Sequence, residues 1–287
     1  MVDILILSHR YDRPMGDLGY SINILVDHWR RMGLNVANTL GPSRLRDGGS
    51  AAVVVNHVGL TVTPAAYIKF LRRFSRAVNG ELTNTSKSAF CQNLVSQPDD
   101  YDGSVIVKTE LDSGSAGEHA FRPRSGPAAW LRYLRGADAG LSKTKKFTRS
   151  RYLIYDHPDL VPAKFWGNPH FVIQKFQAEM ESEDLFRLRS WYVLGDRDFH
   201  VLTVSKKPIV KGHNIIDRWV VDLATPPEMT AMRKAMRVDY GRFDYVIVEG
   251  KPVVFDINRT PISTAGAVAK YAPQWEQLAE GIKSFLS

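Results

Sequence analysis

The chain has 287 residues, enough for two or three small lobes with a substantial core, and its composition is that of a soluble globular protein. The net charge of +8 suits a partner with phosphates or carboxylates, but a solvated basic surface accounts for it too. No apolar run is long enough to cross a bilayer, and the single cysteine, Cys91, excludes an internal disulfide. We therefore expect a cytoplasmic protein without a membrane or nucleic-acid partner.

The first eighty residues predict a small parallel α/β lobe. A buried strand at 4–7 opens into a loop, and a helix follows over 18–32 until Gly33 ends it. A second buried strand at 51–58 precedes a helix expected over 64–78. The apolar face of the first helix comprises Leu18, Ile22, Leu25, Val26 and Trp29.

The middle of the chain changes in composition and predicts a second lobe. A helix is expected over 86–96 and a strand over 104–108, followed by a loop of small residues at 112–117. A basic, loop-rich stretch covers 122–151. We place the first domain at 1–84, the small central lobe at 85–165 and the C-terminal lobe at 166–287.

The C-terminal lobe is predicted to consist mostly of strands. Helices are expected over 227–240 and 267–286. The strand segments are 171–176, 188–195, 200–205, 218–223, 244–248 and 252–256. The last two strands are joined by a short turn centred near Gly250, typical of a hairpin.

This hairpin carries the strongest chemical signal. Asp256 and Asn258 are two residues apart on one strand, so their side chains leave the same face, and Asp244 lies opposite them. Carboxylates gathered so closely repel unless a hard cation such as Mg²⁺ lies between them. The alternative is an acidic hairpin end that faces water, but the interleaved apolar residues indicate a strand buried on one face.

A second signal is Lys108, which ends an apolar strand just before the small-residue loop. There, the backbone N–H groups of Ser113 and Gly114 can approach phosphate oxygens without obstruction. The loop does not have a Walker A sequence. A lysine that extends from a strand end into solvent remains the simpler alternative.

Further candidates lie between these two elements. The strand 171–176 leads into an extended segment suited to an adenine edge, and an acid beyond it, Glu183, can accept hydrogen bonds from ribose hydroxyls. Strand-borne cations can neutralise a triphosphate or bind a carboxylate substrate, although each can equally be a solvated surface charge. These cations are Arg187, Arg189, Lys206, Lys207 and Lys211.

Taken in order, these pieces resemble the ATP-grasp superfamily of carboxylate–amine and carboxylate–thiol ligases, similar to ribosomal-protein-modification and D-alanine–D-alanine-like ligases. Lys87 and Lys108 match the two lysines of that family. Asp244 with the run 256–261 (DINRTP) matches its closing signature, with Asp256 where Glu is more frequent. Its linker between lobes is similar to Gln174, Lys175 and Phe176, with lysine in place of the usual acid.

The resemblance implies a fold, cofactors and roles. The fold is an N-terminal α/β domain followed by a two-lobed ATP-grasp unit, in the α/β class with α+β lobes. ATP would be bound with Mg²⁺, or alternatively Mn²⁺, through the metal ligands Asp244, Asp256 and Asn258. Arg189 would stabilise an acyl phosphate, and Lys211 would be a second catalytic cation. The remaining nucleotide contacts would be Lys87, Lys108, Ser113, Gly114, Gln174, Lys175, Phe176 and Glu183.

The implied reaction is the ATP-dependent activation of a small carboxylate as an acyl phosphate, which an amine or similar nucleophile attacks, with release of ADP and phosphate. Two other functions use the same nucleotide residues: a small-molecule kinase, and a homologue that binds ATP without turnover. The identity of the acid and the amine and the oligomeric state stay open.

Overall fold

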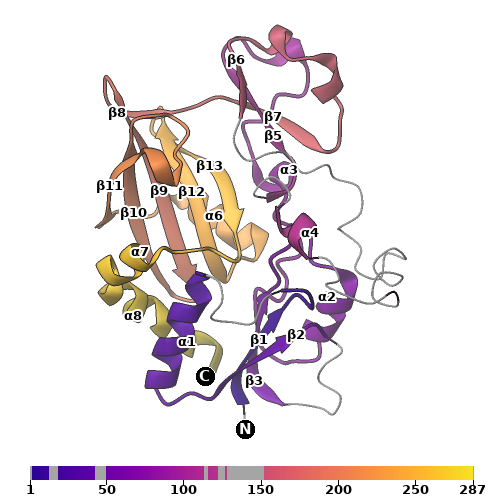
Figure 1. Ribbon diagram of the computed structural model, residues 1–287, viewed down its shortest axis with the longest axis vertical. Coiled ribbons are helices and arrows are strands. Elements are labelled where there is room, and N and C mark those ends of the chain that lie inside the picture. Colours follow the sequence, from indigo (N-terminus) through magenta and orange to yellow (C-terminus); the bar gives the residue numbers. More distant parts are fainter. Residues whose placement is uncertain are drawn as a thin grey trace.

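The computed structural model describes residues 2–12, 19–42, 50–112, 116–121, 127 and 152–286. Its strands form three sheets, arranged as an N-terminal parallel sheet, a small antiparallel lobe and a large antiparallel sheet (Figure 1). The expected fold class, α/β with α+β lobes, is confirmed. None of the helices in this part of the chain has the length and apolar composition required to traverse a bilayer.

The N-terminal sheet is wholly parallel, with the strand order β2-β1-β3-β4. The predicted first helix is present, but the second ends at Leu71, because Ala77 and Val78 pair with β3 instead of continuing the helix. The elements are β1 (Val2–Ser8), α1 (Ser21–Arg31), β2 (Val36–Leu40), β3 (Ala51–His57), α2 (Ala65–Leu71) and β4 (Ala77–Val78).

The small lobe has the antiparallel strand order β6-β5-β7. The helix expected over 86–96 is wrong beyond Phe90, because the backbone N–H of Val95 donates to the carbonyl of Ile173 on β7, at 2.8 Å. The elements of this lobe are α3 (Lys87–Phe90), β5 (Val105–Thr109), β6 (Leu153–Tyr155) and β7 (Phe171–Lys175). Helix α4 (Ala116–Ala120) contacts the N-terminal domain instead, where its Glu118 accepts a hydrogen bond from the backbone N–H of Thr61 at 2.9 Å.

The large sheet has the order β11-β10-β9-β12-β13, and β8 pairs with β9. Helix α6 covers one face, where Met229 packs with Trp191 and Phe243. This helix ends at Met236 and not at 240, because Arg237 adopts a left-handed conformation with φ 57°. The elements are β8 (Glu179–Ser182), β9 (Leu185–Leu194), β10 (Arg197–Ser205), β11 (Ile215–Val221), α6 (Pro227–Met236), β12 (Tyr240–Val248) and β13 (Lys251–Asn258).

The C-terminal helices join this sheet to the N-terminal domain. The single helix expected over 267–286 is three helices, α7 (Ala265–Lys270), α8 (Ala272–Glu280) and α9 (Lys283–Leu286). Helix α8 ends at Gly281, which packs directly against the carbonyl oxygen of Leu194, so that any side chain at this position would clash. Helices α1 and α8 lie side by side (Figure 1), and the Trp29 indole donates to the carbonyl of Ala279 at 2.9 Å.

Candidate active site

The hairpin β12–β13 places acids from both strands on one face. Asp244 lies opposite Asp256, and Arg242 lies opposite Asn258, so all four side chains leave the same face of the hairpin. Strand β12 begins at Tyr240, earlier than predicted, and β13 extends one residue earlier and two residues later than predicted, so Asp244 lies inside a strand and not at its start.

The two aspartates differ in how their oxygens are bonded. Asp244 accepts a hydrogen bond from the Ser190 hydroxyl at 2.6 Å and an ion pair from the Arg242 guanidinium at 2.7 Å. Asp256 is different: its Oδ1 is buried and has no hydrogen-bond partner among the described residues. An ionised carboxylate oxygen in that position strongly favours a cation beside it.

Two lysines approach from the small lobe. The ammonium of Lys87, at the start of α3, lies 3.6 Å from Asp112 Oδ1. Burial, the largest single influence, lowers the pKa of Lys87, but Asp112 and then Asp256, with smaller contributions from Cys91 and Tyr152, together raise it by more, so the net shift is upward. The ammonium of Lys108, on β5, lies 4.8 Å from the centre of the Phe255 ring. Burial, and after it the charge of Lys87, lowers the pKa of Lys108 to about 8.

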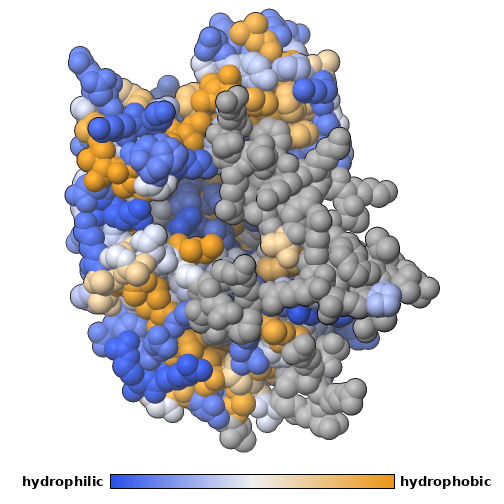
Figure 2. Space-filling view, viewed as in Figure 1, coloured by the Kyte–Doolittle hydropathy of each residue, from blue (hydrophilic) through white to orange (hydrophobic). Residues whose placement is uncertain are grey.

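A cavity of about 280 Å³ between the small lobe and the large sheet brings these groups together. In Figure 2, viewed as in Figure 1, the surface is hollowed beside the large sheet, with hydrophilic residues at the bottom of the hollow. Of the residues given a site role from the sequence, seven line the cavity: Lys87, Lys108, Lys175, Phe176, Lys211, Asp244 and Asp256. Of the other candidate cations, Arg187 lines it too, whereas Lys206 and Lys207 do not.

Four predicted site residues do not line this cavity. Gln174 is fully buried, and its amide contacts the Cys91 sulfur at 2.8 Å. Glu183 is exposed in the turn between β8 and β9. Arg189 is ion-paired with Glu179, and it neighbours Ser190, whose hydroxyl contacts Asp244, so strand alternation directs Arg189 to the other face.

The fourth residue outside the lining is Asn258. Its side-chain oxygen accepts a hydrogen bond from the backbone N–H of Thr260 at 2.9 Å, which closes a turn after β13. Ser113 and Gly114 lie outside the described residues, so their contact with phosphate remains a prediction.

The cavity also contains residues that the sequence interpretation did not assign. Arg242 lines it, and its guanidinium lies 5.9 Å from the Tyr192 ring. Burial is the largest single influence on the pKa of Arg242 and lowers it, but Asp244 and Tyr192 together raise it by more, so the net shift is upward and this arginine stays charged. Its position two residues before Asp244 on one strand was the available signal. Tyr152 also lines the cavity, and its hydroxyl accepts a hydrogen bond from Lys211 at 3.1 Å.

The donor set of this cavity fits a magnesium ion that is completed by a bound anion. Mg²⁺ is typically held by one or two carboxylates, with water and phosphate oxygens filling its shell. Asp256 and Asp244 supply the carboxylates, and Asp256 has an unbonded oxygen. Within the described ranges, no three His, Cys, Asp or Glu side chains gather closely enough to hold a metal ion by themselves.

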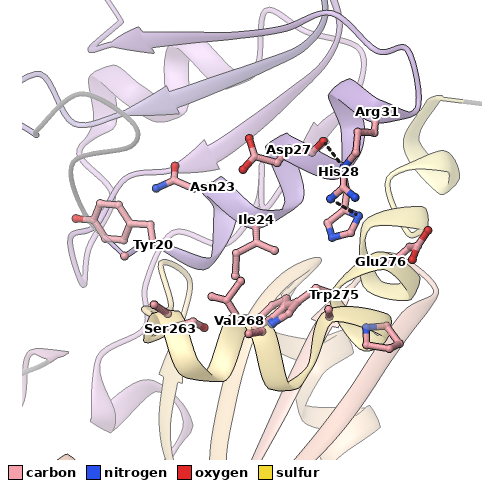
Figure 3. A pocket seen from close by; sticks show the side chains of 15 residues that line it. Tyr20, Asn23, Ile24, Asp27, His28, Arg31, Ser263, Val268, Trp275 and Glu276 are labelled. Carbon is pink, nitrogen blue, oxygen red and sulfur yellow. Dashed lines mark hydrogen bonds between the residues drawn. The ribbon is translucent and has the colours of Figure 1, made fainter.

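A second cavity, of about 570 Å³, lies between α1 and the helices α7 and α8 (Figure 3). Its walls are mainly apolar, with Ile24 and Val268 facing each other. Charged groups stand at its rim, where Arg31 contacts His28 at 3.1 Å. It is larger than the first cavity, but none of the described lysines lines it. We call it the α1 groove.

Comparison with solved structures identifies the fold. The ATP-grasp ligase PsnB, complexed with a phosphomimetic variant of minimal precursor, Mg and ADP, is similar over 100% of this chain and 99% of its own, with a TM-score of 0.55 and 10% identity. A RiPP-associated ATP-grasp ligase of Chryseobacterium gregarium, in complex with ADP and a leader and core peptide, is similar over 98% of this chain and 96% of its own, with a TM-score of 0.54 and 12% identity.

These likenesses show that the chain has the ATP-grasp fold, and the fold expected from the sequence resemblance is thereby confirmed. No protein-family model matches the chain, and no curated protein matches it significantly. The activity must therefore be argued from the residues of the cavity itself.

Proposed function

We propose that this chain is an ATP-dependent ligase, which phosphorylates a carboxylate to an acyl phosphate and joins the acyl group to an amine. One observation carries the proposal: Lys87, Lys108 and two aspartates, one with an unbonded oxygen, line a single cavity between the lobes. Phosphoryl transfer requires charge neutralisation and alignment more than it requires a protein nucleophile.

The cations of the cavity have distinct proposed roles. Lys87 and Lys108 come from the small lobe and would bind the inner phosphates. Lys211 would bind the outer phosphate, held in place by Tyr152. Arg242 takes the role that the sequence resemblance assigned to Arg189, because it lines the cavity and is oriented by Asp244, whereas Arg189 is paired elsewhere.

Magnesium would be held by Asp256 and Asp244, with Asn258 able to join them if its turn opens. Bound there, the ion would neutralise charge on the terminal phosphates. Lys175, Phe176 and Gln177 form the extended segment beside the cavity, the position proposed for adenine. Gln174 and Glu183 have no place in this arrangement, because neither lines the cavity.

The acceptor pair is proposed at the level of chemical class. The reaction consumes ATP, a carboxylate and an amine, and it releases ADP, phosphate and an amide. The two similar structures named above contain a precursor variant or peptides, so we include peptide carboxylates along with free amino acids among the candidates.

The test is ATP-dependent release of ADP and phosphate across a panel of carboxylates and amines. Asp256→Asn should abolish Mg²⁺-dependent ADP formation and leave the fold intact, whereas Asp222→Asn, which alters an exposed aspartate, should not. Full activity in the Asp256 variant would remove the basis of the proposal. A stable phosphoester would instead identify a kinase, and Mg-ATP binding without any ADP formed would identify a binding protein.

A further inference from the structure

Asp112 contacts three segments of the chain near Lys87. It lies three residues after β5, and its backbone N–H donates to the Thr61 hydroxyl, in the N-terminal domain, at 2.9 Å. Its Oδ2 accepts a hydrogen bond at 2.7 Å from Thr85, just before α3. Its Oδ1 lies 3.6 Å from the Lys87 ammonium. Thr61 therefore holds the backbone of Asp112, and Thr85 holds its carboxylate, independently of the lysine.

Lys87 has two carboxylates within its electrostatic reach. Asp112 and Asp256 both raise its pKa, in that order of strength, against the effect of burial. A lysine ammonium is a compact charge on a flexible stem, without the fixed geometry of a guanidinium, so its position depends on its partners. The lysine side chain is 8% exposed, so no full solvent shell competes with these two acids.

The structure resolves this competition in favour of Asp112. The ammonium of Lys87 lies within ion-pair distance of Asp112 and not of Asp256, although Oδ1 of each aspartate lacks a hydrogen-bond partner among the described residues. If Asp112 lost its charge, Asp256 would be the remaining acid, and the ammonium would move toward it. The lysine would then occupy the place where a cation and phosphate oxygens are expected.

We propose that Asp112 is a positioning residue, which holds the Lys87 ammonium away from Asp256 so that Asp256 remains available to a divalent cation. The inference rests on the proposed nucleotide function of the cavity. It explains why Lys87 and Asp256, which attract each other, lie in one cavity without forming an ion pair. The neighbouring acid Glu110 does not share the role, because its carboxylate accepts hydrogen bonds from Ser88.

The test measures the Mg²⁺ concentration that gives half-maximal binding of ADP, by calorimetry on the full chain. Asp112→Asn should raise this concentration about tenfold, because Lys87 then neutralises Asp256. Lys87→Met should weaken ADP binding itself, but adding Asp112→Asn to Lys87→Met should cause no further rise in the Mg²⁺ requirement. Suppression of this kind follows only if Asp112 acts through Lys87.

Two further variants provide a milder change at the same carboxylate and a control at a neighbouring acid. Thr85→Val frees Asp112 Oδ2 and should raise the Mg²⁺ requirement by a smaller factor, and Glu110→Gln should leave it unchanged. An unchanged Mg²⁺ requirement in Asp112→Asn, or equal increases with and without Lys87, would overturn the inference. If the unmodified chain binds no Mg-ADP at all, the proposed function fails first, so the two failures are distinguishable.

Discussion

Two cavities of this protein, the α1 groove and the cavity between the lobes, differ in what lines them. The α1 groove is about 570 Å³ and its walls are mainly apolar, whereas the cavity between the lobes is about 280 Å³ and is lined by lysines, arginines and aspartates. Burying an apolar wall stabilises the fold without any ligand, but burying charge costs free energy unless a partner is supplied. Cavity size therefore misleads here, and the unbalanced buried charge indicates the functional site.

The largest expected effect tests this difference with one arginine from each cavity. Arg242→Ala should lower turnover about 10²- to 10³-fold, the cost of removing one preorganised donor from a transition state. Arg31→Ala, in the rim of the α1 groove, should leave turnover within about twofold. Steady-state rates of ADP release measure both.

A matched variant on the large sheet sharpens the result. Arg189→Ala removes an arginine from the same region of sheet but from the face that carries Glu179. A loss of turnover in Arg189→Ala as large as in Arg242→Ala would restore the role that the sequence resemblance implied for Arg189.

The next effect concerns nucleotide affinity. Lys108→Ala should weaken Mg-ATP binding about 10- to 100-fold, because it removes a charge-assisted contact worth about 1.5–3 kcal/mol. Lys270→Ala, which alters an exposed lysine of α7 beside the α1 groove, is the control and should change the affinity little. Equal losses in the two variants, measured by calorimetry, would mean that Lys108 acts only as general surface charge.

The pH dependence of binding gives a smaller and more specific effect. Burial and then Lys87 lower the pKa of Lys108 to about 8, and bound phosphates should favour its charged form. Affinity should therefore be constant below pH 8, where the free protein already holds the proton, and fall by up to about tenfold per pH unit above it. Lys108→Arg stays charged, so its profile should be flat over that range. A flat profile for the unmodified chain would contradict this assignment.

The sequence predicted those parts of the site that depend on local pattern. Asp244 and Asp256 could be paired because a hairpin with a short turn fixes which residues face each other, and Lys108 could be placed because it follows an apolar run, within β5. Those predictions needed only local features: the position of the turn, an apolar run and the two-residue period of a strand. The same period places Arg242 on the face of Asp244, so the spacing of the strand contained that residue too.

The remaining residues depend on tertiary contacts that spacing does not contain. Strand alternation says only that Arg189 and Ser190 take opposite faces, and the pairing of Arg189 with Glu179 on β8 shows which face is which. Asn258 fits the metal pattern, but its oxygen also closes the turn to Thr260. The short helix α3 reflects the same limit, since the segment after it is held by hydrogen bonds to β7.

A physical route between the two cavities runs through the segment after β13. The Ser21 backbone N–H, at the start of α1, donates to the carbonyl of Pro261, three residues after Asn258, at 2.8 Å. The Ser21 and Ser263 hydroxyls also lie 2.8 Å apart. These bonds hold the end of the hairpin against α1, so a substitution that moved α1 would also move the segment that follows the proposed metal ligands.

The smallest expected effect tests whether the two cavities are nevertheless independent. Ala269→Leu places a larger apolar side chain in the α1 groove from an exposed position of α7. It should change Mg-ATP affinity less than about twofold, because a leucine there can be accommodated in the open groove without moving α1. Calorimetry that instead showed a tenfold loss of affinity would establish that the groove and the nucleotide cavity are coupled.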